Sequence, residues 1–184
     1  MTLRPVLLVS LAALSLAGCH KQAESDSLSL HEVMAGTIDP SADVIWNVGS
    51  KSYGADGGPQ IGLLNDQEWK KIADAADKLH EGAAYIADHQ DIAVVKPGMK
   101  ILDEGVHPEA ITAKQVTGYV EADRPGLVAR ARELAALSVS IRNAAIAKDA
   151  AVMIRDSEQL DEVCESCHKK FWYPALKAAR PAAK

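Results

Sequence analysis

Apolar residues recur at helical spacing in four long stretches of this chain, and no other sequence feature constrains its fold as strongly. The stretches span about residues 29–49, 65–89, 124–147 and 149–173 of the 184. Each has a polar opposite face, as helices packed around one shared core require. The connection 91–123 is long for such a fold, and residues 111–120 within it can form a short helix. We therefore predict an all-α fold, an antiparallel four-helix bundle with a long connection between its second and third helices.

Local signals mark where some of these helices begin or break. Asn65 and Glu68 have the spacing of a capping box, which predicts a helix start at Asn65. Asp39-Pro40 interrupts the first stretch. We expect a kink there, or a restart with Asp39 as the N-cap and Pro40 at the first helical position. Pro174 marks the end of the last stretch.

The first 18 residues have the pattern of an export signal. Arg4 gives a positively charged start, and residues 6–16 form an apolar run. That run is too short to span a bilayer, which takes about 20 residues. It leads into the sequence L-A-G-C, which ends at Cys19 and resembles the lipobox of bacterial lipoproteins. In those proteins a lipid is attached to the cysteine and the chain is cleaved just before it. The alternative is an ordinary signal peptide with an incidental cysteine.

The lipobox resemblance implies a division of the chain into four parts. Residues 1–18 would be a removed signal peptide, and 19–29 a polar tether with its lipid on Cys19. Residues 30–175 would form the bundle, and 176–184 a disordered tail. The lipid would hold a periplasmic domain on a membrane surface, with nothing crossing the membrane. His20, in place of Asp after the cysteine, weakly favours the outer membrane.

Near the end of the chain, Cys164-Glu165-Ser166-Cys167-His168 is a C-x-x-C-H motif, the attachment signal for covalent c-type haem. On a helix, Cys164, Cys167 and His168 stand at i, i+3 and i+4 and leave the same face. Two thioether bonds would fix the edge of the ring, and His168 would be the proximal ligand of the iron. We therefore predict one covalent haem c.

Other chemistries compete for these residue types. A C-x-x-C pair can be a redox dithiol or half of a zinc site. The dithiol interpretation lacks a strand before the motif, and the zinc interpretation lacks a second cysteine pair. A net charge of -5 argues against a nucleic-acid binder. The sequence has no Ser/His/Asp triad and no phosphate-binding glycine loop, so we expect no enzyme.

A C-x-x-C-H motif on the last helix of an all-α chain resembles the class II cytochromes c, the family of cytochrome c′ and cytochrome c-556. The resemblance covers most of the mature chain by helix order. Its specific residues are the motif itself and Phe171, the aromatic residue three positions after His168. The proline in the first helix and the long connection depart from cytochrome c′. Relatives of this kind often dimerise through their first two helices, so a homodimer is an open prediction.

The resemblance also implies a candidate for the other axial position of the iron. Cytochromes c-556 place a methionine from the first helix there, which here corresponds to Met34. A thioether ligand would raise the reduction potential. Met34 could equally be a core residue that fills space beside the ring. His89 and Met99 are weaker rivals, and an open site as in cytochrome c′ is the remaining alternative.

Together these features predict a protein that transfers electrons to and from redox partner proteins. The alternative is a five-coordinate haem protein that binds nitric oxide or carbon monoxide. A metal-storage or stress lipoprotein without haem is the third hypothesis.

Overall fold

The computed structural model describes residues 27–55, 58, 60, 63–106 and 110–173, and over these residues it is helical without a β-strand. The all-α class is therefore confirmed. The elements are α1 (Leu30–Val33), the π-helical segment η1 (Met34–Ile38), α2 (Asp39–Gly49), the 3₁₀ helix η2 (Ser50–Ser52), α3 (Asp66–Asp88), α4 (Ala113–Ala122), α5 (Arg124–Ala147) and α6 (Ala150–Phe171).

The first helix continues through Pro40 without a break, because its backbone forms a wider, π-helical turn just before the proline. The backbone N–H of Asp39 donates to the carbonyl of Met34, five residues earlier, which makes a π-turn. Pro40 has no N–H to donate, and its ring would clash with the carbonyl four residues earlier in a regular helix; the wider turn relieves this conflict. Pro40 does lie in the first turn of α2, but the side chain of Asp39 caps nothing. The prediction of Asp39 as an N-cap was wrong.

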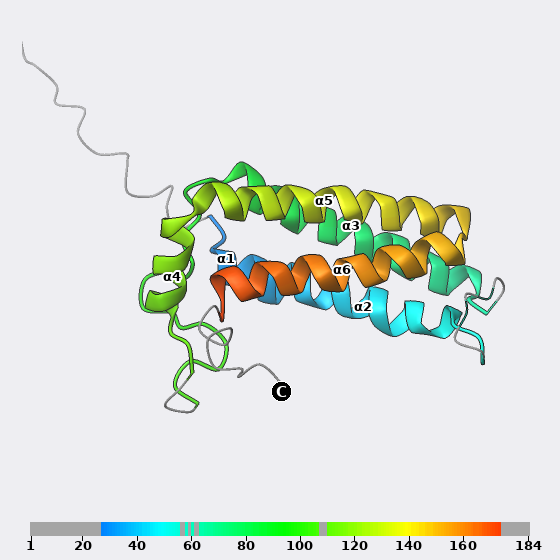
Figure 1. The fold of residues 1–184 in the computed structure, drawn as a ribbon, viewed down its shortest axis with the longest axis horizontal. Coiled ribbons are helices and arrows are strands. Elements are labelled where there is room, and N and C mark those ends of the chain that lie inside the picture. Colours follow the sequence, from blue (N-terminus) through cyan, green and yellow to red (C-terminus); the bar gives the residue numbers. More distant parts are fainter. Residues whose placement is uncertain (1–26, 56–57, 59, 61–62, 107–109, 174–184) are drawn as a thin grey trace, which may run out of the picture.

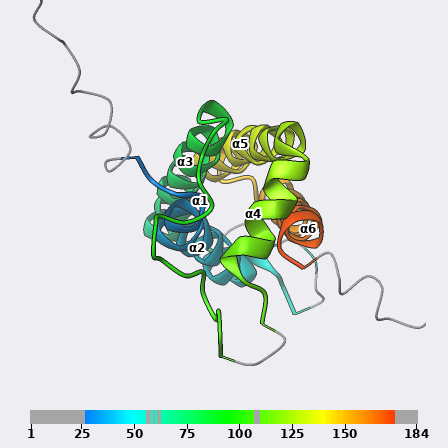
Figure 2. The same ribbon diagram turned by 90° about the vertical axis from the view of Figure 1, so that its left-hand side faces the viewer.

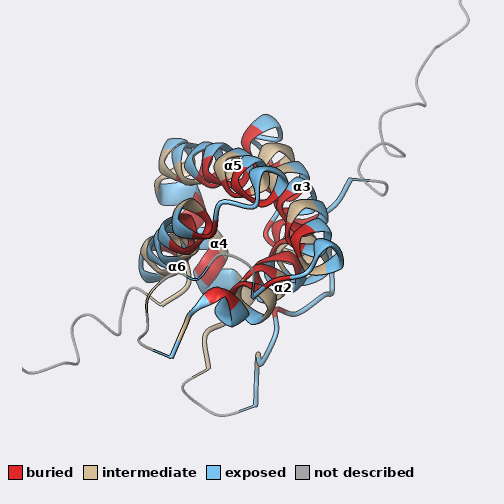
Figure 3. Ribbon diagram, turned by 90° about the vertical axis from the view of Figure 1, so that its right-hand side faces the viewer, coloured by how far each residue is buried: buried red, intermediate tan, exposed pale blue. Residues whose placement is uncertain are grey.

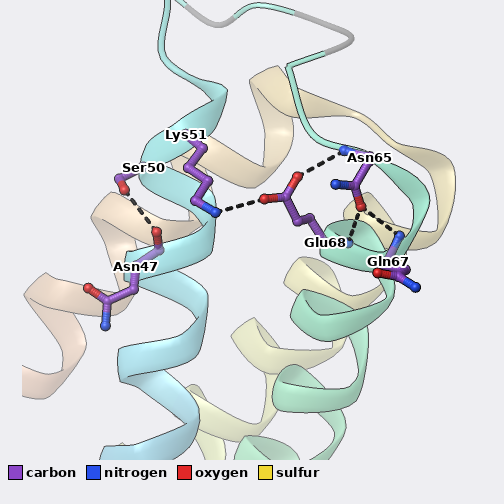
Figure 4. A network of polar contacts seen from close by, with 6 residues as sticks. All are labelled: Asn47, Ser50, Lys51, Asn65, Gln67 and Glu68. Atoms are coloured by element: carbon purple, nitrogen blue, oxygen red, sulfur yellow. Dashed lines mark hydrogen bonds and ion pairs between the residues drawn. The ribbon is translucent and has the colours of Figure 1, made fainter.

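The start of α3 is held as its sequence predicted (Figure 4). The Asn65 side chain accepts hydrogen bonds from the N–H groups of Gln67 and Glu68, both at 3.0 Å. The Glu68 carboxylate accepts the N–H of Asn65 at 3.0 Å, which completes the capping box. The same carboxylate pairs with Lys51 of η2 at 2.8 Å, so the cap also ties the end of the first helix to α3.

The long helices α2, α3, α5 and α6 lie side by side, and successive ones run in opposite directions (Figure 1). Helix α3 contacts both α2 and α5, and α6 contacts α5 and α2. Their buried residues face inward around a common axis (Figure 3). The side chains that solvent does not reach at all include one or more from each helix: Ile45, Ile72, Leu79, Ile141, Met153 and Leu160.

Helix α4 lies across the end of the long helices where α1 begins and α6 ends (Figure 2). It forms close to the expected 111–120 and buries Val116 and Val120. The connection that leads to it is fastened to its surroundings by backbone hydrogen bonds. The N–H of Leu30 donates to the carbonyl of Ala93 at 2.8 Å, and that of His31 to Val94 at 3.0 Å.

Residues 1–26 and 174–184 lie outside the described part of the chain. The export signal, lipidation at Cys19, most of the tether and the tail 176–184 therefore remain predictions. Among the described helices, none combines the length and the apolar character that crossing a bilayer requires.

Candidate functional site

The C-x-x-C-H motif occupies the last two turns of α6. Asp149 caps the start of this helix by accepting the N–H of Val152 at 3.0 Å. At its other end, the carbonyl of His168 accepts the N–H groups of Trp172 and Tyr173 at 2.8 and 2.9 Å. The motif is thus wholly helical, as predicted, and helical geometry places its two cysteines and His168 on one face.

This face of α6 is directed toward the core. Cys164 and Cys167 are free, half-buried and packed against the hydrophobic cluster, and Phe171 is buried within it. Burial raises the pKa of the Cys164 thiol to about 12, and the neighbouring thiol of Cys167 and the carboxylate of Asp39 add to the rise. Burial likewise raises the pKa of Cys167 to about 11, against the positive charges of Arg130 and Lys170. Both groups are therefore neutral thiols at neutral pH.

The raised pKa values of the thiols weigh against one alternative chemistry of a cysteine pair, the redox dithiol. A redox dithiol needs a thiol whose pKa is lowered, so that a reactive thiolate forms. Here the pKa of both Cys164 and Cys167 is raised. In the described residues, His, Cys, Asp and Glu side chains form no group of three that could hold a bare metal ion.

The carboxyl group of Asp39, on the first helix, acts electrostatically on the motif, although the sequence pattern at Asp39 indicated only a disturbed helix. Desolvation of its carboxyl group raises its pKa, although the residue as a whole is exposed to solvent. The charge of His168 acts in the opposite direction on the same carboxyl, and Asp39 in turn acts on Cys164. The residue thus lies within electrostatic reach of the motif. Asp39 follows the buried Ile38 but is itself exposed, so its sequence position gave no signal of this proximity.

A second carboxylate lies on the motif's own helix. Glu165 accepts a hydrogen bond from the hydroxyl of Tyr173 and pairs with Lys169 at 2.9 Å. The Tyr173 hydrogen bond, and then that from Lys169, lower the pKa of Glu165, and the charge of His168 contributes. The ring of Tyr173 is 6.0 Å from that of His168. His168 is therefore accompanied by carboxylates on two elements, Asp39 on α2 and Glu165 on α6.

The three candidates for the other axial position differ in their surroundings. Met34 begins the π-turn of η1, is half-buried, and packs against the core. His89 ends α3 with an exposed ring that stacks on Tyr85 at 3.8 Å and whose Nδ1 bonds the Tyr85 carbonyl at 2.8 Å. Met99 is 57% exposed. Of the three, only Met34 packs against the core.

The donor set fits a covalently attached haem. It provides two neutral thiols at helical spacing on the core-facing side of α6, one imidazole beside them, and apolar side chains around them. Comparisons with protein-family models, curated proteins and solved structures found no match to this chain.

Proposed function

We propose that this chain is a monohaem c-type cytochrome that transfers electrons. Cys164 and Cys167 would hold the haem by thioether bonds, and His168 would be the proximal ligand. The observation that carries the proposal is the helical C-x-x-C-H motif on the core-facing side of α6, with both thiols half-buried. When bound, haem supplies an iron centre that takes up and releases one electron.

The residues around His168 suit such a centre. Asp39 and Glu165 both interact electrostatically with His168. Negative charge beside a metal ligand favours the more positively charged, oxidised state of the metal. The aromatic ring of Tyr173 and the buried ring of Phe171 lie at the same end of α6.

We also propose that α2, α3, α5 and α6 form the four-helix bundle of a class II cytochrome c. The alternating helix directions and the position of the motif on the last helix support this assignment. The long connection that carries α4 distinguishes the chain from cytochrome c′.

The place in the cell is a further part of the proposal. A lipid on Cys19 would anchor the mature chain at a membrane facing the periplasm, with the outer membrane favoured. The support is the lipobox sequence that ends at Cys19, together with an attachment motif for haem, which is joined to proteins outside the cytoplasm.

The absorption spectrum of the purified, processed protein tests the function and the axial ligand together. We expect a low-spin spectrum with a thioether-to-iron charge-transfer band. Met34→Ala should abolish this band because it removes the one candidate that packs against the core. Met99→Ala is the matched control, since it removes an exposed methionine, and should leave the band unchanged.

Two other outcomes would contradict parts of the proposal. A high-spin spectrum that shifts when nitric oxide is added, and that Met34→Ala leaves unaltered, would favour the gas-binding alternative and remove Met34 as a ligand. Protein without any haem spectrum, after production in a host that exports and attaches haem, would contradict both functions.

A further inference from the structure

An exposed apolar segment lies between α3 and α4. Met99, Leu102 and Val106 are 57%, 65% and 73% exposed. Among the described residues, only one other large apolar side chain is more than half exposed, Ile146 near the end of α5. We name residues 96–106 the apolar loop. Large apolar side chains gathered on one surface segment typically mark a contact with a membrane or another molecule.

The apolar loop holds these side chains in a defined arrangement. Ile101, in its middle, is only 3% exposed and joins the core. The carboxylate of Glu104 accepts the N–H of Ile101 at 3.3 Å and that of Ala113, the first residue of α4, at 3.0 Å. Asp103 adopts a left-handed conformation with φ 61°, and its carbonyl accepts the N–H of Val106 at 3.1 Å. The loop is therefore tied to the core through Ile101 and to α4 through Glu104.

The base of the apolar loop is joined to the start of the first helix. Lys96 forms an ion pair with Glu32 of α1 at 2.9 Å. Just before it in the sequence, the carbonyls of residues 93 and 94 accept the N–H groups of Leu30 and His31. The start of α1 and the apolar loop both lie at the end of the long helices that α4 covers (Figures 1 and 2). The position where the chain enters the fold and the apolar loop thus share one end of the molecule.

The length of chain before this point limits how far that end can be from an anchored lipid. Leu28 follows Cys19 by nine positions, and an extended chain spans at most about 3.6 Å per position, or ~32 Å in all. A lipid on Cys19 would therefore keep this end of the molecule near the membrane surface. A second contact made by a tethered domain is intramolecular, so even weak insertion of a few apolar side chains is populated.

We infer that the apolar loop is a membrane-contact surface, through which Met99, Leu102 and Val106 enter the headgroup region of the phospholipid layer that carries the Cys19 lipid. The inference rests on the proposed lipid anchor and not on the haem. Lys100, exposed on the same loop as the negatively charged Asp103, supplies a positive charge that suits phospholipid phosphates. The contact would orient the α4-covered end of the molecule, where the C-x-x-C-H motif also lies, toward the membrane.

Fluorescence quenching by brominated lipid tests this contact in the processed, lipidated protein. The protein is reconstituted in vesicles of phosphatidylethanolamine and phosphatidylglycerol with brominated acyl chains. The variants are Leu102→Trp and, as matched control, Ile146→Trp, which is 60% exposed near the end of α5 that is remote from α4. After subtraction of the wild-type signal, we expect bromine to reduce the fluorescence from position 102 by roughly half and to leave that from position 146 unchanged.

Flotation of the wild-type protein with the same vesicles distinguishes a missing loop contact from a missing lipid anchor. Protein that floats with the vesicles but shows no quenching at position 102 would overturn the membrane contact and leave the anchor in place. Wild-type protein that does not float would refute the anchor, and the inference with it. Protection of position 102 from aqueous acrylamide before vesicles are added would also overturn it, because a second copy or another protein would then cover the loop.

Discussion

At the scale of single residues, the arrangement of charge around His168 and the two cysteines defines the site. Burial raises the pKa of Cys164, Cys167 and Asp39, whereas hydrogen bonds lower that of Glu165. The motif thus combines neutral thiols with carboxylates near its imidazole. The sequence predicted that the two cysteines and His168 lie on one face of a helix, because this depends only on their local spacing. It could not predict that Asp39 acts electrostatically on the motif, because that proximity depends on how α2 and α6 pack.

Glu32 allows a residue-scale prediction about pH. Its carboxylate accepts the N–H and hydroxyl of Ser29, both at 2.8 Å, and pairs with Lys96. The hydrogen bond from the Ser29 backbone, then that from Lys96 and then that from the Ser29 hydroxyl, lower its pKa from 4.5 to about 2. Because the pKa is lower in the folded than in the unfolded chain, charged Glu32 stabilises the fold above pH 4.5, and this contribution is lost as the pH falls toward 2.

We therefore expect Glu32→Gln to lower the Tm at pH 7, and the difference from wild type to shrink below pH 4.5 and vanish near pH 2. Thermal unfolding followed by circular dichroism across this range measures it. Glu121→Gln, which changes an exposed carboxyl group on α4, is the control and should have little effect at any pH. A Tm difference for Glu32→Gln that stays constant from pH 7 to 2 would refute this role.

At the scale of elements, the first helix and α3 are in close contact where the π-turn passes over Gly82. A Cβ atom at Gly82 would lie 3.0 Å from Cγ1 of Ile38 and 3.1 Å from Cγ2 of Thr37. These are residues of η1, so the widened turn that accommodates Pro40 also rests directly on α3. The sequence showed that Asp39-Pro40 disturbs a helix. It could not distinguish a kink from a π-turn, since that choice depends on packing against α3.

A pair of glycine substitutions tests this close approach. Gly82→Val should lower the free energy of unfolding by roughly 1–3 kcal/mol, because its side chain overpacks the contact with Ile38 and Thr37. Gly118→Ala on α4 places its methyl group in open space and should raise stability by about 0.5–1 kcal/mol through helix propensity. Urea unfolding measures both. Equal stability of Gly82→Val and wild type would show that the helices are not in contact there.

At the scale of the whole molecule, features that depend on local sequence could be predicted. Features that depend on long-range contacts could not. The capping box at Asn65 and the helical periodicity gave the helices near their observed bounds, 66–88 for α3 and 124–147 for α5. The path of the connection before α4 could not be predicted, because its bonds to Leu30 and His31 join residues far apart in the sequence. The apolar loop was missed for the same reason: its exposure depends on which neighbours, such as Ile101, enter the core.

Covalent attachment of haem can be tested directly by asking whether the processed protein carries one covalently bound haem. It is produced in a host that exports proteins and attaches haem, then separated on a denaturing gel, stained for haem peroxidase activity and weighed by mass spectrometry. We predict a peroxidase-active band and a mass increase of one haem. Both should disappear in the double variant Cys164→Ser, Cys167→Ser, whose helix α6 is otherwise unchanged in sequence. A wild-type chain that shows neither the band nor the added mass would show that Cys164 and Cys167 hold no haem.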